Sequence, residues 1–197
     1  MRLIAVTSEQ MFEGDARAIA TLLDEGFYAI HLRKPTVELE QVRELLRAIP
    51  ASYHSQITLH DHFSLCGEFG VGGVHLNRRS PHPPCGFVGR VSTSCHSVEE
   101  VERVAAEVDY AFLSPIFNSV SKVGYESRFA VEELAEARAR GVIGDGVVAL
   151  GGVTADNISL VGELGFGGAA LLGYLWSESD GEALRRKARE LMAIVRE

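Results

Sequence analysis

Residues 147–173 read VVALGGVTADNISLVGELGFGGAALLG. The stretch begins with a short apolar run, Val147–Leu150, and continues after a glycine pair with a helical pattern over Ala155–Glu163. It ends with a second apolar run, Gly168–Leu172, which follows another glycine-rich turn. A strand, a helix and a strand in this order indicate a βαβ unit, whose two strands lie parallel.

The same alternation continues outward to both ends of the chain. Eight apolar runs predict strands at Leu3–Thr7, Ala29–Arg33, Gln56–Asp61, Gly73–Leu76, Arg90–Cys95, Tyr110–Ser114, Val147–Leu150 and Gly168–Leu172. Helical patterns between or after them cover Ala16–Glu25, Val37–Ala48, Val98–Glu107, Val131–Arg140, Ala155–Glu163 and Glu182–Val195. Eight such units favour a closed barrel over an open sheet. We therefore predict an α/β fold, a single (β/α)₈ TIM barrel, with residues 1–197 forming one domain.

Two segments depart from the alternation. Segment 77–89 holds three of the six prolines and has no helical period, so we expect a loop in place of the fourth helix. Segment 115–129 is long and polar for a connection from a strand to a helix, and loops of this kind often carry function.

The bulk composition excludes some partners. The formal net charge of −8 argues against nucleic acid, which needs a basic face, but leaves room for a small phosphorylated ligand. No apolar run is long enough to span a membrane. The cysteines Cys66, Cys85 and Cys95 form no CxxC pair, which suits reduced thiols in a cytoplasmic protein.

In a barrel of this class, chemistry lies at the C-terminal ends of the strands. That rule selects a set of polar side chains: His31, Arg33, His60, Asp61, His75, Asn77, Ser94, His96 and Ser114. Glycines follow the last two strands, and Gly151, Gly152 and Gly173 would let backbone amides approach a phosphate. Ordinary turn chemistry is the alternative explanation for these glycines.

Two cations are candidates for binding that phosphate. Lys122 follows the sixth strand in the long loop, where it is either a phosphate ligand or a solvated loop lysine. Arg33 ends the second strand on the same face as His31, so its guanidinium needs a partner. The sequence leaves open whether that partner is Asp61 or an anionic ligand.

Four histidines, His31, His60, His75 and His96, lie on or just after successive strands. A zinc hydrolase of barrel type could use such a set, but no HExxH-like motif is present and we expect the side chains to lie at different depths. Structural, hydrogen-bonded histidines are the alternative that we favour.

Several stretches together are similar to the thiamine phosphate synthase and TenI-like family. They are His31–Lys34, Thr58–Asp61, Gly73–Leu76, Ser94–Ser97, Asp109–Lys122, Ala149–Val153 and Phe166–Gly173. The resemblance covers nearly the whole chain in family order. It implies a (β/α)₈ barrel of thiamine biosynthesis, either a synthase that couples a pyrimidine pyrophosphate to a thiazole phosphate with Mg²⁺, or a thiazole tautomerase without a cofactor.

The resemblance also implies roles for individual residues. Arg33 and Lys122 would bind phosphate or pyrophosphate, assisted by Ser94 and Ser114. Gly151, Gly152 and Gly173 would line the thiazole-phosphate end, and Asp61 matches an acid that coordinates the metal. We assign catalysis to His31, Arg33, His60 and Lys122, with His96 as a further candidate for proton transfer. Family members are often dimers, so a homodimer is one possibility, although no isolated apolar surface stripe in the sequence requires it.

The chain departs from the family pattern at three points. On the second strand the third cation is replaced by Pro35, although Lys34 is adjacent, and Asn77-Arg78-Arg79-Ser80 lacks a second metal-binding acid. Loss of one carboxylate weakens Mg²⁺ binding. Pro115 stands where the tautomerase has a histidine. A tautomerase, a divergent synthase and a non-catalytic binder of thiazole phosphate or thiamine phosphate therefore all remain open.

Overall fold

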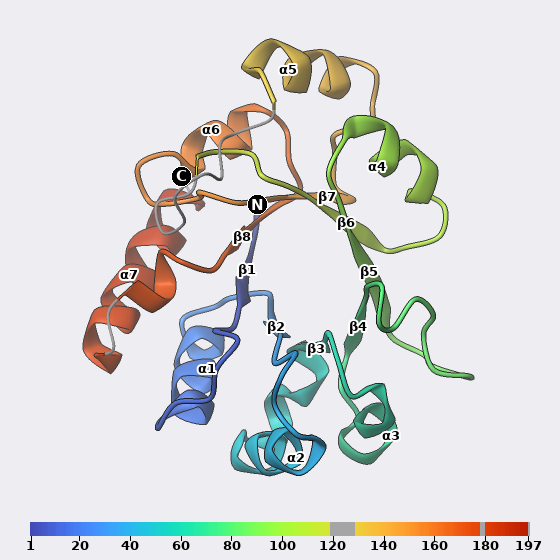
Figure 1. Ribbon diagram of the computed structural model, residues 1–197. Helices are drawn as coiled ribbons and strands as arrows, with labels where there is room; N and C mark the ends of the chain where they lie inside the picture. Colours follow the sequence, from blue (N-terminus) through green and yellow to red (C-terminus); the bar gives the residue numbers. More distant parts are fainter. Residues whose placement is uncertain (119–128, 178–179, 197) are drawn as a thin grey trace.

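The computed structural model describes residues 1–118, 129–177 and 180–196, and its eight strands close into a parallel barrel (Figure 1). Neighbouring strands along the chain are neighbours in the ring, and β1 pairs with β8 to close it. The strands are β1 Arg2–Val6, β2 Ala29–Leu32, β3 Ile57–Leu59, β4 Gly73–Leu76, β5 Arg90–Cys95, β6 Tyr110–Leu113, β7 Val147–Leu150 and β8 Gly168–Leu171. The predicted (β/α)₈ barrel is confirmed.

Helices surround this ring. They are α1 Asp15–Asp24, α2 Leu39–Ala48, α3 Cys66–Phe69, α4 Val98–Val104, α5 Val131–Ala139, α6 Ile158–Glu163 and α7 Gly181–Ile194, with 3-10 turns at Ala51–Gln56, Phe63–Leu65 and Leu175–Ser177. Segment 77–89 contains no helix, as its prolines predict. The short α3 was not predicted, because four residues are too few to show a helical period.

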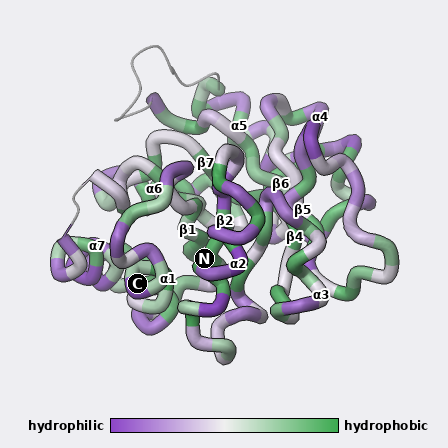
Figure 2. The backbone as a smooth tube through the Cα atoms, turned by 60° about the horizontal axis from the view of Figure 1, so that its bottom comes forward, coloured by the Kyte–Doolittle hydropathy of each residue, from purple (hydrophilic) through white to green (hydrophobic). Residues whose placement is uncertain are grey.

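The main hydrophobic core lies between the barrel and its helices. Each helix turns apolar residues toward the strands, and hydrophobic and hydrophilic residues alternate along the surrounding helices (Figure 2). Leu22 of α1, Leu46 of α2, Val161 of α6 and Leu191 of α7 are completely buried there. This outer core carries most of the apolar burial, so the interior of the barrel is free to hold polar groups.

The barrel interior is divided into an apolar and a polar half. The apolar half comes from β1 and β6–β8 and consists of Ile4, Val6, Tyr110, Phe112, Val148 and Ala170. The polar half comes from β2–β5, where the buried His31, Thr58, His75 and Ser92 alternate with outward apolar residues. Buried polar groups need hydrogen-bond partners, so this half of the barrel interior requires an internal network.

Several of the selected site residues lie just beyond the strand ends. The prediction placed Arg33, His60, Asp61 and Ser114 inside strands, but β2, β3 and β6 end one or two residues earlier. These side chains therefore belong to the C-terminal rim of the barrel. None of the described helices is long and apolar enough to cross a membrane. Cys66, Cys85 and Cys95 are free thiols, and the cytoplasmic location stays a prediction.

Candidate functional site

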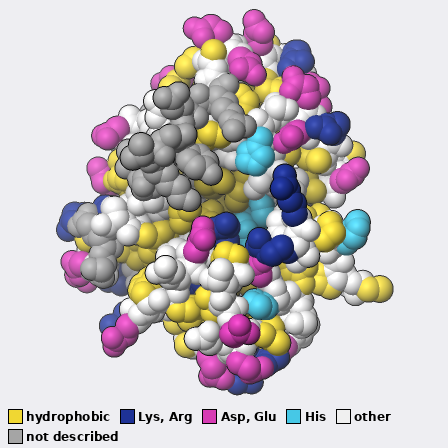
Figure 3. Space-filling model, viewed as in Figure 1, with side chains coloured by type: hydrophobic (Ala, Val, Ile, Leu, Met, Phe, Trp, Pro, Cys, Tyr) yellow, Lys and Arg dark blue, Asp and Glu magenta, His cyan; other side chains and the backbone are white. Residues whose placement is uncertain are grey.

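A cavity of about 860 Å³ opens at the C-terminal mouth of the barrel. Figure 3 shows basic and histidine side chains gathered around a hollow on this face. Four arginines line the cavity: Arg33, Arg78, Arg79 and Arg103. Apolar side chains from the strand ends also line it, namely Val6, Phe112, Leu150 and Leu172. A mouth of this kind suits a ligand that has a ring and an anionic group.

Arg33 lies at the mouth as predicted, but with a different partner. Its guanidinium forms an ion pair with Glu9 of the loop between β1 and α1, not with Asp61. Its backbone N–H donates to Thr7 Oγ1 at 3.0 Å, which ties the ends of β1 and β2 together. The Arg33 side chain is one third exposed. Because a guanidinium carries five N–H donors, an ion pair with one carboxylate leaves donors for phosphate oxygens.

Asp61 is held by Arg79 instead. Arg79 Nε and Nη2 donate to Asp61 Oδ1 at 2.9 and 2.7 Å, while Asp61 Oδ2 is buried without a hydrogen-bond partner. The guanidinium therefore engages Oδ1 and leaves Oδ2 without a partner. Among the described residues, the only group of three metal-binding side chains does not include Asp61. Asp61 Oδ2 is the oxygen that could hold an Mg²⁺ ion, and substrate phosphates would have to supply its other ligands.

The two predicted phosphate-binding serines are bonded to histidines at the rim. Ser94 Oγ contacts His75 Nε2 at 2.9 Å, and Ser114 Oγ lies 3.4 Å from His96 Nδ1. His96 Nδ1 also donates to the Ser114 carbonyl oxygen at 3.0 Å. The bond to that carbonyl requires the proton on Nδ1, so Nε2 of a neutral His96 is an acceptor. His96 lines the cavity, and this makes it the exposed imidazole of the mouth.

Gly151 and Gly152 form the turn after β7 with positive φ angles of 97° and 67°. The turn is tied to the segment after β6, because Ile116 N donates to Leu150 O and Phe117 N to Gly151 O, both at 3.0 Å. A Cβ on Gly151 would meet Pro115 Cα at 2.9 Å. Turn chemistry and close backbone packing therefore both require these glycines. Their phosphate role and that of Gly173 stay predictions, and Lys122 lies outside the described residues.

We expect Gly152→Ala to lower the free energy of unfolding by about 2–3 kcal/mol. The new Cβ would lie 2.4 Å from Asn118 O on a backbone that L-residues rarely adopt. Urea unfolding measures the effect. The control is Gly162→Ala in α6, where the added methyl meets nothing within 4 Å and alanine is the better helix former. Equal stability of the two variants would contradict the packing described here.

Below the rim, three histidines form a buried group with Tyr110. His31 Nδ1 and His60 Nε2 share a hydrogen bond of 2.8 Å, and His31 Nε2 lies 2.6 Å from the Tyr110 hydroxyl. His75 stacks on His60 with ring centroids 4.1 Å apart, and its Nδ1 bonds Ser92 Oγ at 2.9 Å. His31 lies deeper than His60 and His75, as expected, but one ring nitrogen of each still comes within 4.8 Å of the other two. His60 and His75 line the cavity, whereas His31 is completely buried beneath them.

Burial keeps these imidazoles neutral. It lowers the pKa of His75 to about 3, with a smaller contribution from the positive charge of Arg33. Burial also holds the pKa values of His31 and His60 well below the ordinary value of 6.5, and the neighbouring His75 acts in the same direction. At neutral pH the group therefore presents ring nitrogens without charge.

The sequence reasoning missed several residues of the mouth. Arg78 and Arg79 enter the sequence analysis only as part of a segment that lacks the second metal-binding acid. Two adjacent cations just after a strand could have predicted anion binding. Glu9 and Tyr110 gave no signal of their own. They were found only because the barrel brings them against Arg33 and His31.

These features define a (β/α)₈-barrel protein whose mouth suits a small anionic ligand. A model of the family described as thiamine monophosphate synthase matches residues 3–175. The chain belongs to that family, as the resemblance of its motifs predicts.

Individual relatives agree with this assignment. Thiamine-phosphate synthase from Methanoculleus marisnigri is 30% identical over 173 residues, which cover 83% of this chain and 80% of that protein. The enzyme of the same name from Listeria welshimeri is 30% identical over 138 residues, which cover 66% of this chain and 65% of that protein. A crystal structure of thiamine phosphate pyrophosphorylase from Bacteroides thetaiotaomicron shares 38% identity with a TM-score of 0.91, over 100% of this chain and 98% of that one.

Proposed function

We propose that this protein is a thiamine-pathway transferase that joins a pyrimidine pyrophosphate to a thiazole phosphate and releases pyrophosphate. The observation that carries the proposal is the mouth cavity of about 860 Å³, which Arg33, Arg78 and Arg79 line together with apolar side chains of the strand ends. Two heteroaromatic rings would lie against those apolar side chains, with their phosphate groups at the arginines. Relatives named thiamine-phosphate synthase support the same activity.

Catalysis would be mainly electrostatic. The bond between the methylene carbon on the pyrimidine and the pyrophosphate oxygen breaks, and its electron pair leaves with pyrophosphate. The thiazole nitrogen supplies the electron pair for the new bond to that carbon. Arg33, fixed by Glu9, and Arg79, fixed by Asp61, would stabilise the charge that develops on the leaving group. Each guanidinium is oriented before substrate binds, which reduces the reorganisation needed in the transition state.

One observation favours a second candidate, the thiazole tautomerase. Asp61 is engaged by Arg79, and a tautomerase requires no metal. His96 is an exposed imidazole at the cavity, and histidine is the usual group for proton transfer near neutral pH. His96 Nε2 is the atom that would accept the proton.

The deciding assay offers the pyrimidine pyrophosphate and the thiazole phosphate, with and without Mg²⁺, and follows thiamine phosphate and pyrophosphate. Formation of both products supports the transferase. Aromatisation of the thiazole tautomer without thiamine phosphate would replace it with the tautomerase. Calorimetric binding of the thiazole phosphate without any turnover would leave a non-catalytic binder.

In the coupling reaction we expect Arg33→Gln to lower kcat/KM by about 10²–10³-fold, because it removes a fixed donor to the leaving group. The matched control is Arg47→Gln. Arg47 is an exposed arginine in the last turn of α2 that pairs with Glu44 and does not line the mouth cavity. A loss below tenfold in Arg33→Gln, with the control unchanged, would show that Arg33 does not bind the reacting groups.

A further inference from the structure

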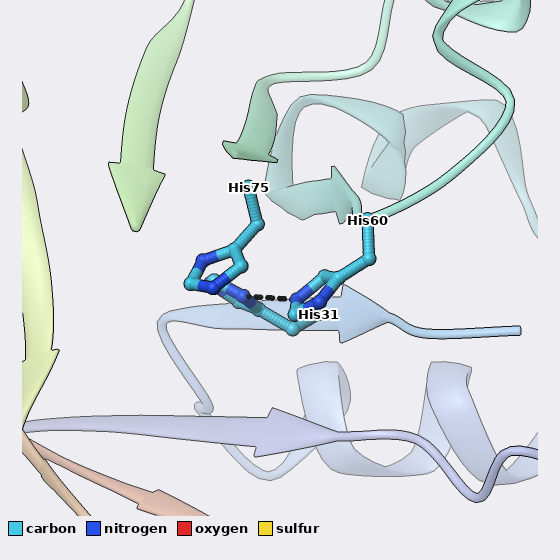
Figure 4. A group of neighbouring side chains, drawn as sticks. All are labelled: His31, His60 and His75. Carbon is cyan, nitrogen blue, oxygen red and sulfur yellow. Dashed lines mark hydrogen bonds between the residues drawn. The ribbon is translucent and has the colours of Figure 1, made fainter. Parts of the chain in front are cut away.

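Three histidines from adjacent strands present their ring nitrogens to one another at the floor of the mouth cavity (Figure 4). One nitrogen from each of His31, His60 and His75 lies within 4.8 Å of the other two. We propose that His31, His60 and His75 form a binding site for a divalent transition-metal ion of the Zn²⁺ type. The proposal concerns a site separate from Asp61 and does not rest on the proposed function.

Strand register explains why the three side chains meet. In β3 and β4, Thr58 pairs with Gly73, so His60 and His75, each two residues further on, fall at the same level. His31 pairs with Thr58, which places it one level deeper. Its imidazole nevertheless reaches upward, as the 2.8 Å bond to His60 shows. Side chains from two successive levels of the barrel interior therefore converge on one point.

The donor set favours borderline metals over Mg²⁺. Imidazole nitrogens suit Zn²⁺, Co²⁺, Ni²⁺ and Cu²⁺, whereas Mg²⁺ prefers oxygen ligands. Three protein ligands and one open position are the arrangement found in catalytic zinc sites. Burial keeps the pKa of His75 and of both neighbours low, so the neutral form that coordinates a metal is already present.

Outer partners would hold the ligands in place. Metal-binding histidines commonly bond a second group through the nitrogen that faces away from the metal. His31 Nε2 is hydrogen-bonded to Tyr110 Oη at 2.6 Å, and His75 Nδ1 is hydrogen-bonded to Ser92 Oγ at 2.9 Å. The ion would then replace the His31–His60 hydrogen bond and the contact of His75 Nε2 with Ser94. The open position faces the cavity, where a water or a phosphate oxygen would complete the coordination.

The experiment measures metal binding without any substrate. Chelator-treated full-length protein is titrated with Zn²⁺ by calorimetry and with Co²⁺ by visible absorption. We expect one ion per chain and at least a 100-fold loss of affinity in His75→Gln and in His60→Gln. His96→Gln removes a histidine from the same mouth but outside the group, and it should bind as the unchanged protein does.

A conservative variant covers the case in which a histidine substitution unfolds the barrel. Tyr110→Phe keeps the ring in the apolar half of the interior and removes only the hydroxyl that holds His31, so we expect about a tenfold loss of affinity. Absence of stoichiometric binding to the unchanged protein would overturn the proposal. So would a loss below tenfold in the folded histidine variants, because the ion would then bind elsewhere.

Discussion

Lowering the pH from 5.5 to 4.5 is expected to reduce the free energy of unfolding by about 1.4 kcal/mol through His75, and His31 and His60 should add losses of the same sign. In the unfolded chain each histidine binds a proton below its ordinary pKa of 6.5. In the fold they stay neutral, because burial lowers the pKa of His75 to about 3 and holds the other two well below 6.5. His75 therefore contributes a loss of about 1.4 kcal/mol per pH unit over this range, and His31 and His60 act in the same direction.

The direction of the effect follows from these pKa values. For His75 the stabilisation is complete above pH 6.5 and is lost progressively as the pH falls toward 3. Urea unfolding at pH 7.0, 5.5 and 4.5, with a chelator present, measures it. His75→Gln keeps a hydrogen-bonding side chain beside Ser92, and it should lose about 1.4 kcal/mol less between pH 5.5 and 4.5. Identical losses in both proteins would mean that His75 is protonated in the fold.

Replacing Asp15 by alanine is expected to destabilise the protein by about 3–5 kcal/mol, because it leaves a buried lysine without its counter-ion. Lys34 Nζ lies 2.7 Å from Asp15 Oδ2 and donates to Gln10 O at 2.7 Å. The two side chains are only 1% and 2% exposed. Lys34 is the cation next to Pro35, which replaces the third cation of the family pattern. Its ammonium group is bound by Gln10 and Asp15 and does not line the mouth cavity.

A double variant separates the ion pair from its surroundings. Asp15→Leu with Lys34→Met exchanges two buried charges for apolar groups, and this should recover most of the stability lost in Asp15→Ala. Chemical unfolding of all three proteins makes the comparison. If the double variant is as unstable as Asp15→Ala, the loss comes from the shape of the site and not from an unpaired charge. Asp15 begins α1 directly after the loop that carries Glu9, so Asp15→Ala should also loosen the Glu9–Arg33 pair at the mouth.

The strand order was accessible from the sequence because each apolar run alternates with a helical pattern. The loop at 77–89 was also predicted correctly, since prolines remove the backbone donors that a helix needs. The ends of strands were less accessible. The predicted third strand extends to His60 and Asp61, but the chain leaves the sheet after Leu59. A strand ends where its hydrogen bonds to the adjacent strand end, and the sequence of one strand does not show where that is.

Residue types at the mouth were predictable, whereas their pairings were not. Arg33 and Asp61 were both expected at the rim, and both lie there. Their partners, Glu9 and Arg79, come from loops whose paths depend on packing against the barrel. An Arg33–Asp61 pair, one of the two possibilities that the sequence left open, is absent among the described ion pairs for that reason.

Local pattern alone determined the parallel barrel, the family motifs and the rim on which chemistry is expected, because hydrophobic periodicity and turn residues act over a few neighbouring positions. The tertiary structure decided the rest. It brought His31, His60 and His75 together from three strands, buried Lys34 against Asp15 and placed Arg79 on Asp61. These contacts join residues far apart in the chain, and their distances, burial and charge states exist only once the ring of strands has closed.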